Sequence, residues 1–301
     1  MTQSNAVRLP RPGSLERGIR LKGWLFILPA LILVTLLCFY PMVQAFLLSL
    51  QSGKGNALKW AGMTNYTRLL KDRTFIAAVK NTLFYLVVQV PVMLLLALIL
   101  ATMLNDKTLR GKGVYRTLIF LPCATSLVSC SMVFRQLFSV NGFVNTVLTS
   151  LNLIKDPIPF LTNPVWAKMV IIITMLWRWT GYNMVLYLAG LQNIDSQVYE
   201  AARIDGASVV QMFTRITAPL LRPVIVFTTV LSTNGTLQLF DEVINMTNGG
   251  PGNGTISLSL YIYRTTFQNV PQFGYACAIG FFILIVVAVL SGLQRKVGDL
   301  A

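Results

Sequence analysis

Long apolar runs constrain this chain more than any other feature of its sequence. A helix needs about 20 mostly apolar residues to cross the hydrocarbon core of a bilayer, and six runs in the sequence approach or exceed that length. We expect spans at about residues 24–50, 82–104, 117–138, 170–191, 223–240 and 275–293. The sequence therefore predicts an all-α, polytopic membrane protein with six transmembrane helices.

The composition agrees with a membrane protein. Of the 301 residues, 54% are hydrophobic and 12% are charged, whereas soluble domains carry about 25% charged residues. The formal net charge of +15 could suggest nucleic-acid binding, but nucleic-acid-binding proteins are rich in charge overall. Here the basic residues lie between apolar runs. We therefore expect the lipid bilayer as a partner, and no nucleic acid.

Several catalytic and cofactor-binding groups are missing from the sequence. It has no histidine, which excludes a zinc or haem site built on imidazole, and no Gly-x-x-x-x-Gly-Lys-Ser/Thr loop for ATP phosphates. Neither paired carboxylates in a polar pocket nor a serine with a histidine base are present. Four cysteines lie in apolar runs and form no Cys-x-x-Cys pair, which is typical of thiols used as small hydrophobic side chains: Cys38, Cys123, Cys130 and Cys277. We expect no metal, no bound cofactor and no enzymatic activity of the chain's own.

The distribution of Lys and Arg predicts the orientation in the membrane. The run at 24–50 is too long for a signal peptide, so we expect an uncleaved anchor. Residues 1–23 and 297–301 would then both be cytoplasmic, and the cytoplasmic segments would hold a modest excess of Lys and Arg over the outer ones. The exception is the segment 51–80, whose basic residues would all face outward: Lys54, Lys59, Arg68, Lys71, Arg73 and Lys80.

Residues 195–219, between the fourth and fifth expected spans, form an amphipathic segment. Asp195 or Ser196 can cap a helix, and Asp205-Gly206 supplies a break because glycine readily adopts a positive φ. A second short helix would carry an apolar face made of Val209, Met212, Phe213 and Ile216. Such a helix–turn–helix can dock another protein or rest on lipid headgroups, and the pattern alone favours neither.

The same segment resembles a known motif. It reads Glu200-Ala201-Ala202, three residues, Gly206, nine residues, Ile216, one residue and Ala218-Pro219. This spacing resembles the EAA motif in permease subunits of binding-protein-dependent ABC importers. Ala218 stands where those permeases usually have Leu. One apolar residue in place of another hardly weakens the match to the motif.

The resemblance extends over about residues 24–296. Residues 240–251 end in Thr247-Asn-Gly249-Gly250-Pro251, which looks like the Thr-x-Gly-Gly-Pro loop of carbohydrate permeases of the maltose and glycerol-phosphate type. Residues 179–195 are similar to the fourth span of sugar permeases. Residues 60–66 are similar to the outward loop and short helix after the first span, which supports placing 51–80 outside.

The resemblance implies the fold of a type I ABC importer permease in a bacterial cell membrane, with residues 24–296 as the permease domain. It implies as partners a second, different permease, two cytoplasmic ATPase subunits that hold ATP and Mg, and an extracellular solute-binding protein. A coupling helix would sit in a cleft of the ATPase and transmit its closure, which rocks the permease halves between inward-open and outward-open states. The residues implied in coupling are Glu200, Ala201, Ala202, Asp205, Gly206, Met212, Phe213, Ile216 and Pro219.

Polar residues inside the spans are candidates for the transport path, because polar groups are costly in hydrocarbon. On the expected fifth span, three of them recur at i, i+4 and i+7, which places them on one helix face: Asn234, Gln238 and Asp241. The fourth span offers Tyr182, Asn183 and Tyr187. Amides and carboxylates can hydrogen-bond to sugar hydroxyls, and aromatic rings can pack on the apolar face of a sugar. Alternatively, these groups hydrogen-bond helix to helix within the bundle.

Arg178 is the basic residue in the middle of the fourth span. Pairing with Asp241 would lower the free-energy cost of placing this charge in the bilayer, and so would extension of the side chain to the outer headgroups. The sequence does not decide between the two.

The expected function is a translocation path for a sugar or oligosaccharide delivered by an extracellular binding protein. A secondary transporter or channel for a small polar solute is the alternative, but the internal repeat typical of such proteins is not found between residues 24–150 and 165–296. A membrane-embedded enzyme would need a base, nucleophile or metal set that the sequence lacks.

Overall fold

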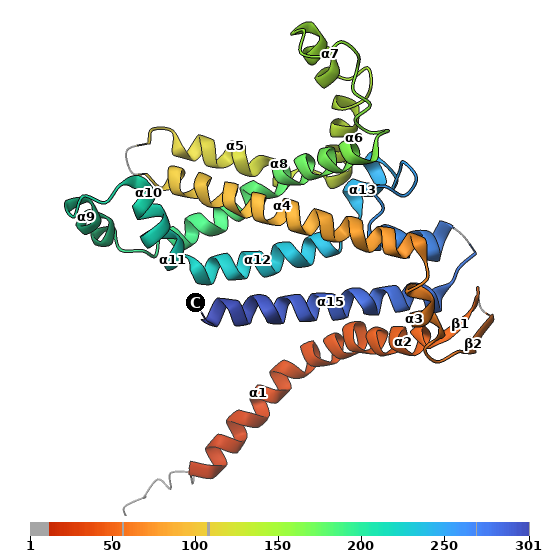
Figure 1. The fold of residues 1–301 in the computed structure, drawn as a ribbon. Coiled ribbons are helices and arrows are strands. Elements are labelled where there is room, and N and C mark those ends of the chain that lie inside the picture. The colour runs from red at the N-terminus through yellow and green to blue at the C-terminus, as the bar shows by residue number, and fades with distance from the viewer. Residues whose placement is uncertain (1–11, 56, 107–108, 269, 301) are drawn as a thin grey trace, which may run out of the picture.

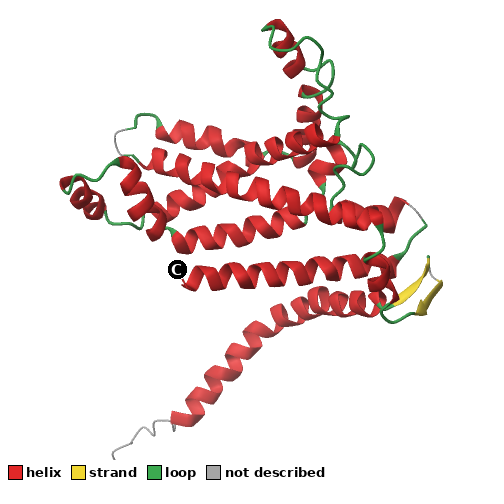
Figure 2. Cartoon of the chain, viewed as in Figure 1, coloured by secondary structure: helices red, strands yellow, loops and turns green. Residues whose placement is uncertain are grey.

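The computed structural model describes residues 12–300, except for 56, 107, 108 and 269. The described chain is mostly helical, with one small β-hairpin (Figures 1 and 2). Its N-terminal part is one curved rod made of α1 (Pro12–Val34), a π-helical turn (Thr35–Phe39) and α2 (Tyr40–Ser49). The most apolar stretch within Lys22–Ser49 contains no buried residue. Lipid or another protein must therefore cover this surface.

A small antiparallel hairpin follows the rod. It consists of β1 (Gln51–Lys54) and β2 (Ala57–Trp60), with Gln51 opposite Trp60, and it leads into α3 (Thr64–Leu69). The side-chain amide of Asn65 donates to the carbonyl oxygens of Ser49 and Gln51, at 2.8 and 2.7 Å. This buried amide fixes α3 against the end of α2.

Four long helices run alongside one another in the body of the molecule (Figure 1). They are α4 (Arg73–Asn105), α8 (Pro164–Leu191), α12 (Arg222–Leu237) and α15 (Phe273–Leu300). The spans expected at 82–104, 170–191 and 275–293 lie inside α4, α8 and α15. Helix α4 begins nine residues before the apolar run because the Asp72 carboxylate caps it at the backbone N–H groups of Thr74 and Phe75. Hydropathy detects the apolar part of such a helix and misses its polar first turns.

The span expected at 117–138 is broken in the structure. Residues 112–137 form α5 (Lys112–Ala124) and α6 (Leu127–Leu137), which meet at an angle of 97°. Pro122 lies in the last turn of α5 and lacks the N–H that would continue the helical hydrogen bonds. The short helix α7 (Phe143–Ser150) extends the chain beyond α6.

The span expected at 223–240 is shorter in the structure and is also part of a bent pair. The segment Val209–Leu220 meets α12 at 72°, and α12 ends at Leu237. Two short helices follow it, α13 (Asp241–Met246) and α14 (Leu258–Tyr263), and the π-helical turn Arg264–Gln268 leads on toward α15. Among the described residues, four helices are long and apolar enough to cross a membrane, or up to six if each bent pair is one span.

The segment between α8 and α12 lies at one end of the bundle, and the hairpin with α3 lies at the other (Figure 1). It contains α9 (Ser196–Ile204), α10 (Val209–Met212), the π-helical turn Phe213–Thr217 and α11 (Ala218–Leu220). The C-terminal end of α15 lies at the same end of the bundle as this segment.

Candidate substrate pocket and coupling surface

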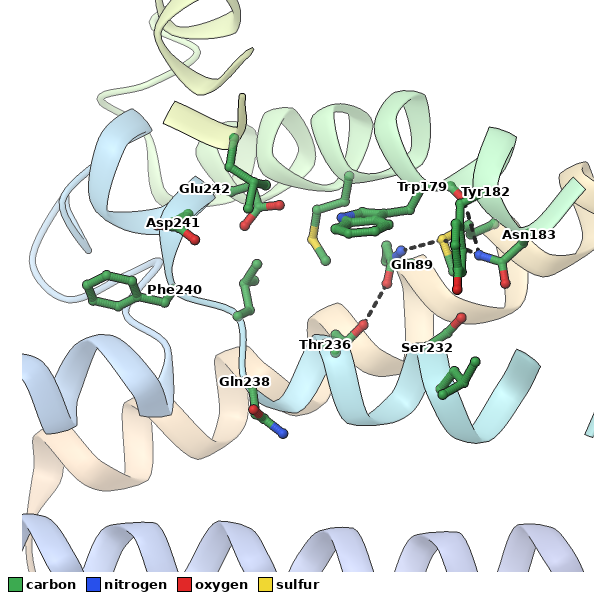
Figure 3. Close-up of a pocket in the computed structure, with 16 residues that line it drawn as sticks. Gln89, Trp179, Tyr182, Asn183, Ser232, Thr236, Gln238, Phe240, Asp241 and Glu242 are labelled. Atoms are coloured by element: carbon green, nitrogen blue, oxygen red, sulfur yellow. Dashed lines mark hydrogen bonds between the residues drawn. The ribbon is translucent and has the colours of Figure 1, made fainter. Parts of the chain in front are cut away.

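A cavity of about 360 Å³ lies among α4, α8, α12 and α13 (Figure 3). Its wall combines apolar side chains with aromatic rings, amides, hydroxyls and two carboxylates. A ligand pocket of this kind is mostly apolar, with a few polar groups that orient the ligand. The polar and aromatic residues that line it are Gln89, Trp179, Tyr182, Asn183, Ser232, Thr236, Gln238, Phe240, Asp241 and Glu242.

Four of the six residues expected in the transport path line this cavity: Tyr182, Asn183, Gln238 and Asp241. Asn234 instead lines a second, open cavity of about 590 Å³, which is formed by residues of α12, α14 and α15 and which Gln238 also borders. Tyr187 lies at neither. It is fully buried, and its hydroxyl lies 2.8 Å from that of Thr228 on α12. For Tyr187 the helix-to-helix interpretation therefore applies.

The single polar helix face expected for the fifth span does not reach Asp241. The N–H of Gln238 is shared between the carbonyl oxygens of Asn234 and Gly235, both at 3.3 Å, and the helix ends there. Phe240 has a non-helical backbone, and Asp241 starts the next helix. Asp241 therefore lines the cavity because the chain breaks between α12 and α13. It does not continue the helix face that carries Asn234 and Gln238.

Several residues of the cavity were missed by sequence reasoning. Gln89 on α4 accepts a hydrogen bond from the Thr236 hydroxyl at 3.0 Å and is almost fully buried. Trp179 and Glu242 face the cavity from α8 and α13 (Figure 3). An amide inside the apolar run 82–104 was a usable signal for Gln89. For Trp179 and Glu242 the sequence held no comparable signal, because only the fold brings them together.

Arg178 has partners that the sequence did not suggest. The residue is 5% exposed, and its guanidinium donates to the carbonyl oxygens of Pro122 and Cys123 at 3.2 and 3.3 Å and to the hydroxyl of Thr125 at 3.3 Å. Both expected solutions, pairing with Asp241 and extension to the headgroups, are therefore wrong. The arginine binds the C-terminal end of α5, whose last carbonyls have no partner within the helix.

The expected turn of the coupling segment is present. Asp195 caps α9 through the backbone N–H of Gln197 at 3.0 Å. Gly206 has a φ of +75°, a conformation that suits glycine. Ser208 and Gln211 then form a capping box at the start of α10.

The exposed apolar surface of this segment differs from the expected one. Met212 and Ile216 are half-buried, and Phe213 packs against the core cluster around Met184 and Leu221. Part of this stripe lies in the π-helical turn Phe213–Thr217.

The most exposed apolar side chains of this segment are those of Ile204, Val209 and Val210, which are 86%, 75% and 70% exposed. Glu200, Ala201, Asp205 and Gly206 are also exposed, whereas Ala202 is buried. We call Ile204, Val209 and Val210 the apolar tip. These three side chains are free to contact another protein.

Comparison with known proteins agrees with this architecture. The chain is 52% identical over 93% of its length to the lactose transport system permease protein LacF of Rhizobium radiobacter, of which it covers 95%. It is 34% identical over 89% of its length to the arabinooligosaccharides transport system permease protein AraP of Halalkalibacterium halodurans, of which it covers 84%.

A solved structure has the same fold. A chain of the bacterial alginate ABC transporter, crystallised in complex with an alginate pentasaccharide-bound periplasmic protein, superposes with a TM-score of 0.82 at 26% identity. The superposition covers 94% of this chain and 95% of that one. Residues 74–299 match the family described as the binding-protein-dependent transport system inner membrane component. This chain therefore belongs to the family of inner-membrane permease components of binding-protein-dependent transport systems.

Proposed function

We propose that this chain is a permease subunit of an ATP-driven importer and forms the translocation path for a sugar or oligosaccharide delivered by an extracellular solute-binding protein. The observation that carries the proposal is the cavity between α4, α8, α12 and α13, in a chain 52% identical to a lactose permease component. The energy comes from a separate ATPase, since permease subunits of this family do not hydrolyse ATP themselves.

The chemistry of the cavity suits a sugar. Trp179 and Tyr182 offer ring faces for the C–H groups of a pyranose, and Asp241 and Gln238 offer acceptors and donors for its hydroxyl groups. The volume of about 360 Å³ lies within the usual range for small-molecule pockets, about 300–1,000 Å³. Lactose is the first compound to test.

The partners follow from the surfaces that the chain leaves uncovered. A second, different permease would cover part of the exposed apolar rod Lys22–Ser49. Two ATPase subunits carrying ATP and Mg would serve the pair of permeases, one binding the apolar tip beside Glu200. The solute-binding protein would dock at the opposite end of the bundle, where the hairpin lies. Both chain termini would then be cytoplasmic, at the ATPase end, in a bacterial cell membrane.

Reconstitution tests the proposal. The chain would be assembled in proteoliposomes with the second permease, the ATPase and the binding protein of the same transport system. We expect uptake of radiolabelled lactose that requires both ATP and the binding protein, and no ATP hydrolysis by this chain alone. Uptake that persists without ATP and without the binding protein would instead support the secondary transporter or channel.

A further inference from the structure

The break between α5 and α6 is held by one buried side chain. Arg178, in the middle of α8, donates three hydrogen bonds to the last turn of α5 and to Thr125 just beyond it. Thr125 itself donates to the carbonyl oxygen of Pro122 at 2.7 Å. The carbonyl oxygen of Pro122 thus accepts from both Thr125 and Arg178, and that of Cys123 accepts from Arg178 on the neighbouring helix.

A cation at this place is favourable for two reasons. The C-terminal end of a helix carries partial negative charge, so a guanidinium there is attracted to it. A buried cation is costly unless hydrogen bonds compensate it, and the guanidinium of Arg178 donates three here. Arginine suits this role because its planar fork can reach several acceptors at once.

Helix α5 is also locked against α8 by close backbone contact. A Cβ atom built on Gly181, one turn after Arg178, would lie 2.0 Å from the carbonyl oxygen of Ile119. Only glycine permits this approach. The C-terminal half of α5 is therefore fixed to α8 at two adjacent points, by the glycine contact and by the arginine.

The bend that results forms part of the cavity. The first residue of α6, Leu127, lines the cavity together with Trp179, the residue after Arg178. If α5 continued straight, the chain after Ala124 would not turn through 97° and Leu127 would leave this wall. The arginine thus connects the course of the broken span to the shape of the candidate sugar pocket.

We propose that Arg178 is a positioning residue of the pocket: by binding the end of α5 it holds the α5–α6 bend that places Leu127 in the cavity wall. The proposal rests on the proposed function only where it concerns sugar; the bend itself can be measured without any substrate.

The test uses the assembled transporter in lipid nanodiscs. The four native cysteines are replaced by alanine, and spin labels are attached after Leu118→Cys on α5 and Met132→Cys on α6, two exposed positions on either side of the bend. The distance between the labels reports the bend. In the same assembly without labels, sugar-stimulated ATP hydrolysis gives the half-saturating concentration of lactose-loaded binding protein and the maximal rate.

In Arg178→Met we expect a longer and broader distance distribution, because the end of α5 has lost its donors. The half-saturating concentration should rise by about tenfold, as for the loss of hydrogen bonds to a charged group, with a smaller change in the maximal rate. Lys168→Met is the matched control: it removes a half-buried cation from α8 that stacks on Phe84 and does not touch α5. The control should leave both readouts unchanged.

If the distance between the labels is unchanged in Arg178→Met, the proposal is overturned. If the distance changes but the half-saturating concentration of loaded binding protein does not, the link between the bend and the pocket is overturned. If Arg178→Met does not assemble, Thr125→Val replaces it, because it removes one acceptor at an exposed site and no charge. It should broaden the distance distribution and raise the half-saturating concentration by about threefold. Wild-type behaviour of Thr125→Val in both readouts would then count against the proposal. If the wild-type complex does not transport lactose, only the proposed function is contradicted, because the distance between the spin labels is measured without sugar.

Discussion

The side-chain amide of Gln238 donates a 2.6 Å hydrogen bond to Oδ1 of Asn234, one helical turn earlier on α12. Gln238 borders both of the cavities described above, whereas Asn234 borders the second of the two. The two amides therefore stand as a pair at the partition between the cavities. A sugar that passes from one cavity to the other would have to compete with this hydrogen bond.

Removal of either amide should impair transport selectively. In Gln238→Ala and in Asn234→Ala we expect sugar uptake to fall about two- to tenfold, since one hydrogen bond contributes about 0.5–1.5 kcal/mol. Assembly and sugar capture by the binding protein should be unaffected. Uptake in proteoliposomes and size-exclusion chromatography of the complex measure the two properties. Asn193→Ala, which removes an exposed amide after the end of α8, is the control. If the complex fails to assemble and uptake shows no selective defect, Asn234 and Gln238 serve as a helix-to-helix contact.

Tyr187 should behave as a core residue. Tyr187→Phe removes the hydroxyl that bonds to Thr228 and leaves the ring in place. We expect a stability loss of about 0.5–1.5 kcal/mol and an unchanged half-saturating concentration. Thermal unfolding of the complex and uptake at varied sugar concentration measure these. A higher half-saturating sugar concentration with unchanged stability would instead indicate that Tyr187 lies in the transport path.

The apolar tip and the buried stripe of the coupling segment should respond differently to charge. Ile204→Asp and Val209→Asp place a charge at exposed positions, so the fold should persist while ATPase coupling is lost. Phe213→Asp should instead lower the stability by about 1–3 kcal/mol, because Phe213 packs on the core. Sugar-stimulated ATP hydrolysis and thermal unfolding distinguish the two outcomes.

The control for the tip is Leu153→Asp, a 66% exposed apolar position three residues after α7, which lies far from the coupling segment in Figure 1. It should retain coupling. If sugar still stimulates ATP hydrolysis normally in both tip variants, the segment is only a surface helix and does not transmit ATPase closure.

The stability of the hairpin end of the bundle should depend on the charge of Asp72. Its Oδ2 atom accepts the hydroxyl protons of Tyr261 and Tyr275 at 2.5 and 2.6 Å, while Oδ1 caps α4. Burial acts to raise the pKa of Asp72, but these hydrogen bonds outweigh it and hold the pKa below its usual value. Burial, and after it the same carboxylate, raise the pKa of Tyr261 to about 12.

Because the pKa of Asp72 is lowered in the fold, its contribution to stability is present above the unfolded-state pKa of about 3.9 and is lost as the pH falls through the folded-state value. We therefore expect the unfolding temperature to drop below about pH 4. Asp72→Asn keeps a capping oxygen without the titration, so it should flatten this drop. An identical acid profile in Asp72→Asn would exclude Asp72 as its source.

The sequence determined the positions of the long helices and of the coupling turn. A run of apolar residues of spanning length must pair its backbone polar groups internally, so α8 and α15 follow from local composition alone. The turn at Gly206 follows in the same way, since the capping residues and the glycine act within a few positions of one another.

Tertiary structure decided what those elements contact. The hydrogen-bond partners of Arg178 lie about 55 positions away along the chain, and Phe213 packs on a cluster that includes Met184, about 30 positions away. Tyr182 and Tyr187 carry similar chemistry on the same helix, yet one lines the cavity and the other is buried against Thr228. A helix pattern gives the face on which a side chain lies, but only the packing of neighbouring helices determines whether that face meets a cavity, a core or lipid.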